Sequence, residues 1–279
     1  MIGCASCVKR EKSPHTLTTA LTIAGSDSGG GAGIQADLKT FAALGVHGTT
    51  VITCITAQNP RRVIDIEVCR AAIIRNQLRA VFEGFAPAAV KTGMLYSESV
   101  IRIVSDFLRR RRVPLVIDPV MVSTSGTNLL KPAARKVLCE RLIPQATLIT
   151  PNLHETEVLL GRRLTSVEDL RAAAKKLQVR FGTAVLVKGG HLRGLREAVD
   201  IFYDGKEELL LSAPFVRGIR THGTGCTYSA AITAYLAKGL PLGAAVANAK
   251  EFVTQAIAQS QMAAGHSVLN SFWQRRTGV

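Results

Sequence analysis

Short apolar runs alternate along the chain with longer stretches in which apolar residues recur every three or four positions. The runs predict buried strands and the recurring pattern predicts amphipathic helices. The predicted strands lie at about residues 21–24, 50–56, 88–91, 115–118, 147–150 and 184–187. The predicted helices lie at about residues 34–44, 71–82, 98–110, 132–141, 153–160, 167–178, 225–237 and 242–262. This alternation indicates an α/β fold with a mainly parallel sheet covered by helices on both faces.

One segment departs from the alternation. Predicted strands at about 199–203 and 208–211 flank Asp204-Gly205, which is a hairpin turn signal. No linker or repeat interrupts residues 17–279, so we expect them to form one domain. Residues 1–16 are polar and predict a disordered leader. The leader lacks the apolar stretch of a signal peptide, which indicates a cytoplasmic protein.

The composition excludes some classes of protein and leaves one alternative open. No apolar run reaches the roughly 18 residues of a membrane span. The net charge is +15, and its densest source is the arginine run at 109–112, which ends a predicted helix where cations suit the dipole. Without interleaved aromatics or a known nucleic-acid module, the charge gives no sign of specific nucleic-acid binding. A basic nucleic-acid-binding protein remains a minor alternative.

The six cysteines do not form a recognisable metal or disulfide pattern. Cys4 and Cys7 form one C-x-x-C pair in the leader, whereas a zinc ribbon needs two such pairs. The other cysteines are scattered along the chain. Reduced thiols in a cytosolic protein are therefore expected.

The heptad Thr221-His222-Gly223-Thr224-Gly225-Cys226-Thr227 leads directly into a predicted helix. Its glycines allow backbone N–H groups to converge at a helix start, where the helix dipole favours an anion. A cysteine at that point lies where a thiolate would be stabilised. The heptad therefore indicates either a phosphoryl-transfer site or a tight loop with an inert cysteine.

A second glycine-rich loop, at residues 25–33, follows the first predicted strand. It is not a Walker A loop, because Gly33 is followed by Ile34 where Gly-Lys-Ser/Thr would be needed. It also lacks the third glycine of a dinucleotide fingerprint, and no acid follows the next strand. The two loops together suggest a phosphate-binding site of a different type.

Eight motifs in order resemble the ribokinase superfamily and, within it, the hydroxymethylpyrimidine kinase/phosphomethylpyrimidine kinase family of thiamine biosynthesis. The motifs are Ala24-Gly25-Ser26-Asp27 with the glycines at 29–33, Gln35-Ala36-Asp37, Thr56-Ala57-Gln58-Asn59, Lys91-Thr92-Gly93-Met94, Asp118-Pro119-Val120-Met121, Thr150-Pro151-Asn152 with Glu155, Lys188-Gly189-Gly190-His191 and the heptad. The resemblance implies a three-layer α/β/α ribokinase-like sandwich and a homodimer. It also implies a small lid formed near the second strand and the 122–127 loop.

The resemblance implies a substrate end made of Asp37, Gln58, Met94, Val120 and Met121. A carboxylate accepts hydrogen bonds and an amide both donates and accepts them, which suits the amine and ring nitrogens of an aminopyrimidine. Simpler interpretations also fit: Asp37 as an acid near a helix start, Gln58 as a polar turn residue and Met94 as a core residue.

The resemblance also implies ATP contacts at Asn152, Lys188, Gly189, Gly190 and Thr221. Glu155 and Asp118 resemble the family's magnesium partners, and Mg²⁺ typically takes one or two carboxylates while keeping several waters. Glu155 is equally explained as the third helical residue of a helix capped by Asn152. Both roles can hold at once.

The resemblance implies that the γ-phosphate lies at the N–H groups of the run from Gly223 through Gly225 to Cys226. In most of the superfamily an aspartate stands where this chain has Cys226, whereas the pyrimidine kinases have cysteine. The helix N-terminus would lower the pKa of the thiol and a closed apolar site would raise it, so Cys226 is either a base or a polarising group.

Two other kinases remain as alternatives. Relatives that phosphorylate pyridoxal efficiently often carry a second cysteine in the lid, where this chain has Ser123. That difference favours a pyrimidine over pyridoxal without excluding a pyridoxal kinase. A sugar kinase fits less well, because Gln58 with Cys226 suits a pyrimidine better than a polyol.

Overall fold

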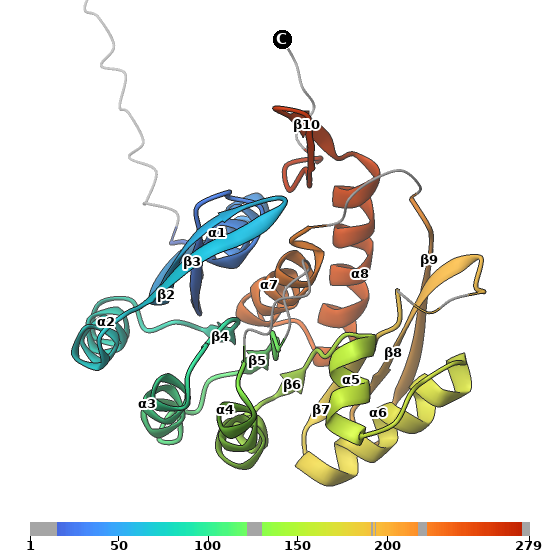
Figure 1. The fold of residues 1–279 in the computed structure, drawn as a ribbon, viewed down its shortest axis with the longest axis horizontal. Helices are drawn as coiled ribbons and strands as arrows, with labels where there is room; N and C mark the ends of the chain where they lie inside the picture. The colour runs from blue at the N-terminus through green and yellow to red at the C-terminus, as the bar shows by residue number, and fades with distance from the viewer. Residues whose placement is uncertain (1–15, 122–129, 191, 193, 217–221, 275–279) are drawn as a thin grey trace, which may run out of the picture.

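The computed structural model describes residues 16–121, 130–190, 192, 194–216 and 222–274. Within them, one sheet has the strand order β3-β2-β1-β4-β5-β6-β7-β8-β9 (Figure 1). Six strands pair in parallel: β1 (Thr19–Asp27), β2 (His47–Asn59), β4 (Ala89–Thr92), β5 (Leu115–Ile117), β6 (Leu148–Ile149) and β7 (Ala184–Lys188). Antiparallel strands complete both edges: β3 (Arg62–Val68), β8 (Glu197–Tyr203) and β9 (Glu208–Pro214).

Helices cover both faces of this sheet, and each face has its own apolar core (Figure 1). One core contains residues of α2 (Ala71–Gly84), α3 (Glu98–Leu108), α4 (Pro132–Val137), α5 (Leu153–Leu160) and α6 (Val167–Phe181). The other contains residues of α1 (Gly33–Ala43), α7 (Thr224–Ala237) and α8 (Leu242–Ala258). Successive strand residues divide between them, as Ala20 and Leu21 do, because side chains alternate across a strand. The predicted three-layer α/β/α fold is confirmed.

The predicted strands and helices are all present, but some end elsewhere. The helix predicted at 132–141 is α4 followed by a π-helical turn (Leu138–Leu142) and a short 3₁₀ turn (Ile143–Gln145). The helix predicted to reach 262 ends at Ala258, and a small hairpin follows with strands β10 (Gln261–Ala263) and β11 (His266–Val268). Edge strand β3 had not been predicted.

Two sequence-based expectations concern segments beyond the described residues. The lid loop predicted at 122–127 lies outside them, as does nearly all of the predicted leader at 1–16. The other part of the predicted lid, beside the second strand, is the β2–β3 hairpin, in which Asn59 pairs with Arg62.

Candidate active site

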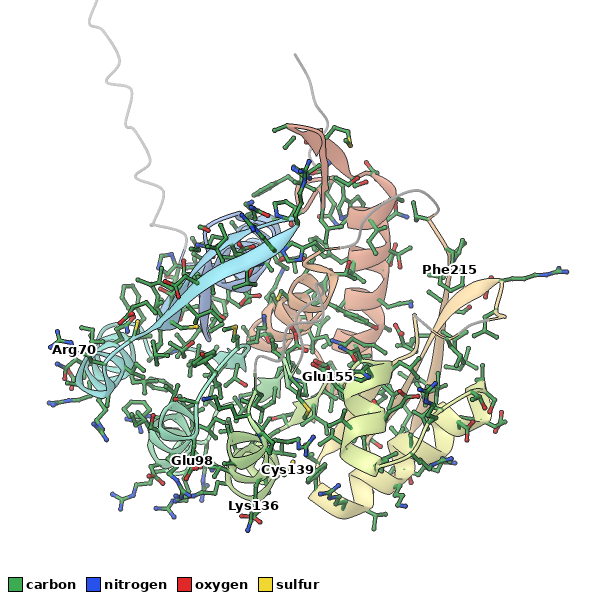
Figure 2. The ribbon with its side chains drawn as sticks, viewed as in Figure 1. Arg70, Glu98, Lys136, Cys139, Glu155 and Phe215 are labelled. Atoms are coloured by element: carbon green, nitrogen blue, oxygen red, sulfur yellow. The ribbon has the colours of Figure 1, made fainter. Side chains whose placement is uncertain are left out.

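A cavity of about 350 Å³ opens at the carboxyl ends of β1, β4, β5 and β7 and reaches the first turn of α7. Ligands in open α/β sheets bind at this edge, because the connecting loops there diverge and helix N-termini converge. Its lining continues past β9 to Phe215, which Figure 2 labels, and to Lys250, Val253, Thr254 and Ile257 of α8. Most of the motif residues therefore lie around one hollow.

The first turn of α7 is held against the glycine loop that follows β1. Gly223 caps α7 with φ of 87°, and a Cβ there would lie 1.8 Å from the carbonyl oxygen of Gly31. Only glycine tolerates both this conformation and this approach. The contact joins two loops that lie about 190 residues apart in sequence and leaves the α7 N–H groups facing the cavity.

A lysine and a carboxylate face the same helix start. Lys188 Nζ lies 3.1 Å from Asp118 Oδ1, and both side chains line the cavity. A Cβ on Gly225 would lie 3.3 Å from Lys188 Nζ and 3.6 Å from Asp118 Oδ2. Burial by itself lowers the pKa of Lys188, but the nearby Asp118 and Glu155 together outweigh burial, so the pKa is raised and the ammonium stays charged. The glycine keeps open a small space beside a cation and helix N–H groups, which suits a phosphoryl group.

Asn152 and Glu155 form a capping box at the start of α5, where Figure 2 labels Glu155. The Asn152 side chain accepts the N–H of Glu155, and Glu155 Oε2 accepts the N–H of Asn152, each at 2.9 Å. Glu155 Oε1 accepts the N–H of Met121 at 3.0 Å. Burial, followed by nearby Asp118, raises the pKa of Glu155. The capping interpretation is confirmed, and the cavity position of Glu155 leaves the metal role as a prediction.

The geometry does not fit the expectation that Asp37 contacts a ligand directly. Its carboxylate is fully buried, accepts the Thr22 hydroxyl at 2.7 Å and forms an ion pair with Lys91, which is also fully buried. Lys91 lines the cavity and Asp37 does not. Burial lowers the pKa of Lys91, but the Asp37 carboxylate together with Cys226 and Asp118 outweighs burial, and the pKa is raised. Asp37 therefore reaches the cavity only through its ion pair with Lys91, and its role in substrate binding stays a prediction.

The other predicted residues divide between the cavity and its supports. Gln58, Met94, Val120 and Gly190 line the cavity. Met121 is a core residue, and Gly189 packs against β8, where a Cβ would lie 2.4 Å from the carbonyl oxygen of Val199. Neither lines the cavity, so direct contact by Met121 and Gly189 does not fit this geometry. Thr221 lies outside the described residues.

Cys226 lies in the first turn of α7 and lines the cavity. Burial raises the pKa of its thiol to about 11, and nearby Lys91 only partly offsets this. Of the two effects that the sequence left open, the raised pKa is the one expected from burial. A thiol with this pKa is protonated near neutral pH, which favours the polarising role, and that role stays a prediction.

Three further residues of the site had no role assigned from the sequence: Lys91, Asp27 and His222. Gln58 Nε2 lies 3.2 Å from His222 Nε2, which lies 3.5 Å from Asp27 Oδ2. Asp27 and His222 occur within the glycine-loop motif and the heptad, so their presence in those motifs was the available signal.

The described part of the chain contains neither a cluster of metal-binding side chains nor a membrane-spanning helix. No group of three or more His, Cys, Asp or Glu side chains is placed there to hold a metal ion. Among the same residues, no helix has the length and apolar character needed to cross a membrane.

Comparison with known proteins gives one consistent result. Residues 27–270 match the family model described as phosphomethylpyrimidine kinase. A hydroxymethylpyrimidine/phosphomethylpyrimidine kinase of Rhizobium meliloti is 52% identical over 239 residues, 85% of this chain and 90% of that protein. A Bacillus subtilis protein of the same description is 40% identical over 95% of this chain and 98% of its own length.

Solved structures with a similar fold include kinases for two kinds of substrate. An ADP complex of a Bacillus subtilis pyridoxal kinase has a TM-score of 0.87 at 39% identity, covering 94% of this chain and all of that one. A phosphomethylpyrimidine kinase of Clostridium difficile has a TM-score of 0.76 at 44% identity, covering 86% of this chain and 99% of that one. The protein is thus a phosphotransferase with a ribokinase-like fold, and the chain belongs to the phosphomethylpyrimidine kinase family.

Proposed function

We propose that the protein transfers the γ-phosphoryl group of ATP to the hydroxymethyl group of 4-amino-5-hydroxymethyl-2-methylpyrimidine. It then phosphorylates the monophosphate to the diphosphate used in thiamine assembly. The observation that carries the proposal is the convergence of the α7 N-terminus, Lys188 and Asp118 on one cavity. Family membership supports the choice of substrate.

Phosphoryl transfer depends mostly on positioning and on stabilising charge. The N–H groups at the start of α7 and the Lys188 ammonium are placed to bind the transferring group. The packing of Gly223 against Gly31 fixes the direction of these N–H groups. They need no rearrangement as charge develops, which is the main source of such stabilisation.

Asp118 and Glu155 fit a magnesium ion that keeps most of its waters. Both carboxylates are buried, line the cavity and lie close enough for Asp118 to affect the pKa of Glu155. Two carboxylates are too few for a site made of protein ligands alone, but they are typical of Mg²⁺ bound with nucleotide phosphates. Bound there, the ion would neutralise phosphate charge.

At the acceptor end, Gln58, Met94 and Val120 line the cavity and we assign them to the pyrimidine ring. Because the Cys226 thiol is protonated, we assign it a polarising contact to the acceptor hydroxyl rather than removal of its proton. Lys91 adds a positive charge at this end, 3.5 Å from the Cys226 carbonyl oxygen.

Pyridoxal is the second candidate substrate, because the fold is close to that of pyridoxal kinases. Ser123, which distinguishes this chain from relatives with a lid cysteine, lies outside the described residues. We place pyridoxal below the pyrimidine because the curated relatives at 40–52% identity are described as pyrimidine kinases.

Product analysis tests the proposal. The protein is incubated with Mg·ATP and hydroxymethylpyrimidine, and the products are separated and identified by mass. We expect the monophosphate first and then the diphosphate. Absence of both products, with pyridoxal phosphate formed under the same conditions, would replace this proposal with the second candidate.

We also propose that the protein is a cytoplasmic homodimer. Ile55 and Ile64, on β2 and β3, are more than half exposed, and such apolar residues at a sheet edge support a subunit contact. Light scattering coupled to size-exclusion chromatography tests the dimer, and a mass near one chain would contradict it.

A further inference from the structure

The glycine loop at residues 25–33 packs directly against the segment that begins α7. A Cβ on Gly223, the cap of α7, would lie only 1.8 Å from the carbonyl oxygen of Gly31. The residue before the cap packs on the same loop, since a Cβ on Gly31 would lie 2.9 Å from His222 Cδ2. The direction of the first N–H groups of α7 therefore depends on the conformation of the glycine loop.

One carboxylate at the end of β1 holds this loop. Asp27 Oδ1 accepts the N–H of Gly29 at 2.8 Å. Asp27 Oδ2 accepts the N–H groups of Gly31 at 3.1 Å and Ala32 at 2.8 Å. Hydrogen bonds to an ionised acceptor are roughly twice as strong as those between neutral groups. The buried Asp27 side chain is thus a main determinant of the loop conformation.

The same carboxylate also contacts the segment before α7. His222 Nε2 lies 3.5 Å from Asp27 Oδ2. Burial raises the pKa of Asp27, but the hydrogen bonds from His222 and from the loop N–H groups outweigh burial, and the pKa is lowered. The carboxylate is therefore charged near neutral pH, which favours a proton on the nitrogen that faces it. Asp27 reaches the cap of α7 in two ways, through Gly31 and through His222.

The backbone of Asp27 is held in turn from the start of α1. Its N–H donates to Gln35 Oε1 at 2.8 Å, and Gln35 Nε2 donates to Ser26 Oγ at 2.8 Å. A backbone N–H needs the oxygen of the amide as its acceptor, so the orientation of Gln35 is determined. Gln35 is outside the cavity lining, whereas Ser26 and Asp27 belong to it. Gln35 thus supports Asp27 from the side away from the ligand.

We propose that Asp27 is a positioning residue for phosphoryl transfer: it holds the glycine loop and His222, and through them it directs the first N–H groups of α7 toward the transferring phosphoryl group. The inference rests on the proposed function and adds a residue to it. The three loop N–H groups and His222 surround both carboxylate oxygens, so we assign Asp27 to the loop rather than to a ligand.

The size of the effect follows from what the α7 N–H groups do. Donors stabilise developing charge best when they are already in place and need no rearrangement. A misplacement of about 1 Å at a reacting group can cost about 10²-fold in rate. Interactions that strengthen only in the transition state change kcat more than they change substrate binding. Loss of Asp27 should therefore lower kcat and leave the KM for the pyrimidine nearly unchanged.

Three variants test the inference. Asp27→Asn keeps the size of the side chain but leaves one acceptor oxygen in place of two. Gln35→Ala is a milder change that removes the acceptor of the Asp27 N–H from outside the cavity lining. Asp204→Asn is the matched control, because Asp204 Oδ1 accepts the N–H groups of Lys206 at 2.8 Å and Glu207 at 2.7 Å in the β8–β9 turn, away from the cavity.

The first measurement is steady-state kinetics with Mg·ATP and hydroxymethylpyrimidine, with kcat expressed per folded protein. We expect kcat to fall about 10–10²-fold in Asp27→Asn and by less in Gln35→Ala. The control should keep the wild-type kcat, and the KM for the pyrimidine should stay close to the wild-type value in all three variants.

The second measurement compares two nucleotide complexes by calorimetry in the presence of Mg²⁺ and the pyrimidine. ADP with aluminium fluoride mimics the transferring phosphoryl group, and AMP-PCP mimics bound ATP. Asp27→Asn should weaken the aluminium fluoride complex about tenfold more than the AMP-PCP complex, because the α7 N–H groups matter most in the transition state.

Three results would overturn the inference. The first is a wild-type kcat in both Asp27→Asn and Gln35→Ala. The second is a raised KM for the pyrimidine with an unchanged kcat, which would make Asp27 a ligand contact. The third is equal weakening of both nucleotide complexes, which would indicate general damage to the cavity. If Asp27→Asn does not fold, Gln35→Ala carries both measurements. Failure of the proposed function is distinguishable, because the wild type itself would then form no phosphorylated pyrimidine.

Discussion

Two lysine–aspartate ion pairs lie beside α7, and they differ in access to the cavity. Both side chains of the Asp37–Lys91 pair are 0% exposed, and the carboxylate has no contact with the cavity. In the Asp118–Lys188 pair the side chains are 6% and 12% exposed, and both line it. The first, shielded pair reaches the cavity only through Lys91, whereas both side chains of the second pair are available to a ligand. We therefore expect the first pair to matter more for stability and the second pair more for phosphoryl transfer.

The largest effect should come from breaking the shielded pair. Lys91→Met leaves the Asp37 carboxylate buried without its partner, so we expect a loss of about 3–5 kcal/mol in the free energy of unfolding. Denaturant titration measures this loss. Asp37→Leu combined with Lys91→Met removes both charges and should recover most of it. A Lys91→Met protein of wild-type stability would contradict the assignment.

Breaking the cavity pair should affect catalysis more than stability. Lys188→Met removes a cation at the proposed phosphate position, and we expect kcat/KM for ATP to fall about 10²–10³-fold. The loss of unfolding free energy should be smaller than for Lys91→Met. Lys206→Met, at the exposed β8–β9 turn, is the matched control. A wild-type kcat/KM for ATP in the Lys188→Met protein would show that Lys188 does not bind the transferring phosphoryl group.

Glu155 has two proposed roles, as a helix cap and as a magnesium partner, and two substitutions distinguish them. Glutamine also serves at the third position of a capping box, so Glu155→Gln should change stability by less than about 1 kcal/mol. The lost charge should raise the Mg²⁺ concentration needed for half-maximal rate. Glu155→Ala removes the cap as well and should cost about 1 kcal/mol more. An unchanged Mg²⁺ requirement in the glutamine variant would leave Glu155 with the capping role alone.

The smallest effect is expected at Cys226. With a pKa of about 11, its alkylation rate should rise tenfold per pH unit through pH 9 without a plateau. Bound substrate should protect Cys226 from alkylation. The experiment uses protein that lacks residues 1–16, so that Cys4 and Cys7 do not react. Cys226→Ala should lose less than the 10²–10⁴-fold expected for a general base. A plateau below pH 8 would show that the thiolate forms near neutrality.

The sequence predicted a helix-covered sheet because short apolar runs mark buried strands and apolar residues recurring every three or four positions mark helices. It missed β3, although residues 62–68 are rich in valine and isoleucine, because their side chains are mostly exposed and the apolar signal is weak. The π-helical turn after Val137 was not visible, since it replaces the end of a pattern that reads as one helix.

Most of the motif residues lie around one cavity, but the motifs could not predict the distances between their side chains. Asp37 lies near the start of α1, as predicted, yet its contact with Lys91, 54 positions away, holds its carboxylate inside the fold. His222 was part of a motif read for its glycines. The side chains of His222 and Gln58 lie 3.2 Å apart although the two residues are separated by 164 positions, and no local sequence pattern contains such a contact.

The central claim is that this cavity selects an aminopyrimidine as the phosphoryl acceptor. It is tested most directly by measuring kcat/KM for hydroxymethylpyrimidine and for pyridoxal with the same Mg·ATP and the same preparation. We predict a preference of at least about tenfold for the pyrimidine, which needs only about 1.4 kcal/mol of difference in transition-state binding. Equal values, or a preference for pyridoxal, would contradict the account.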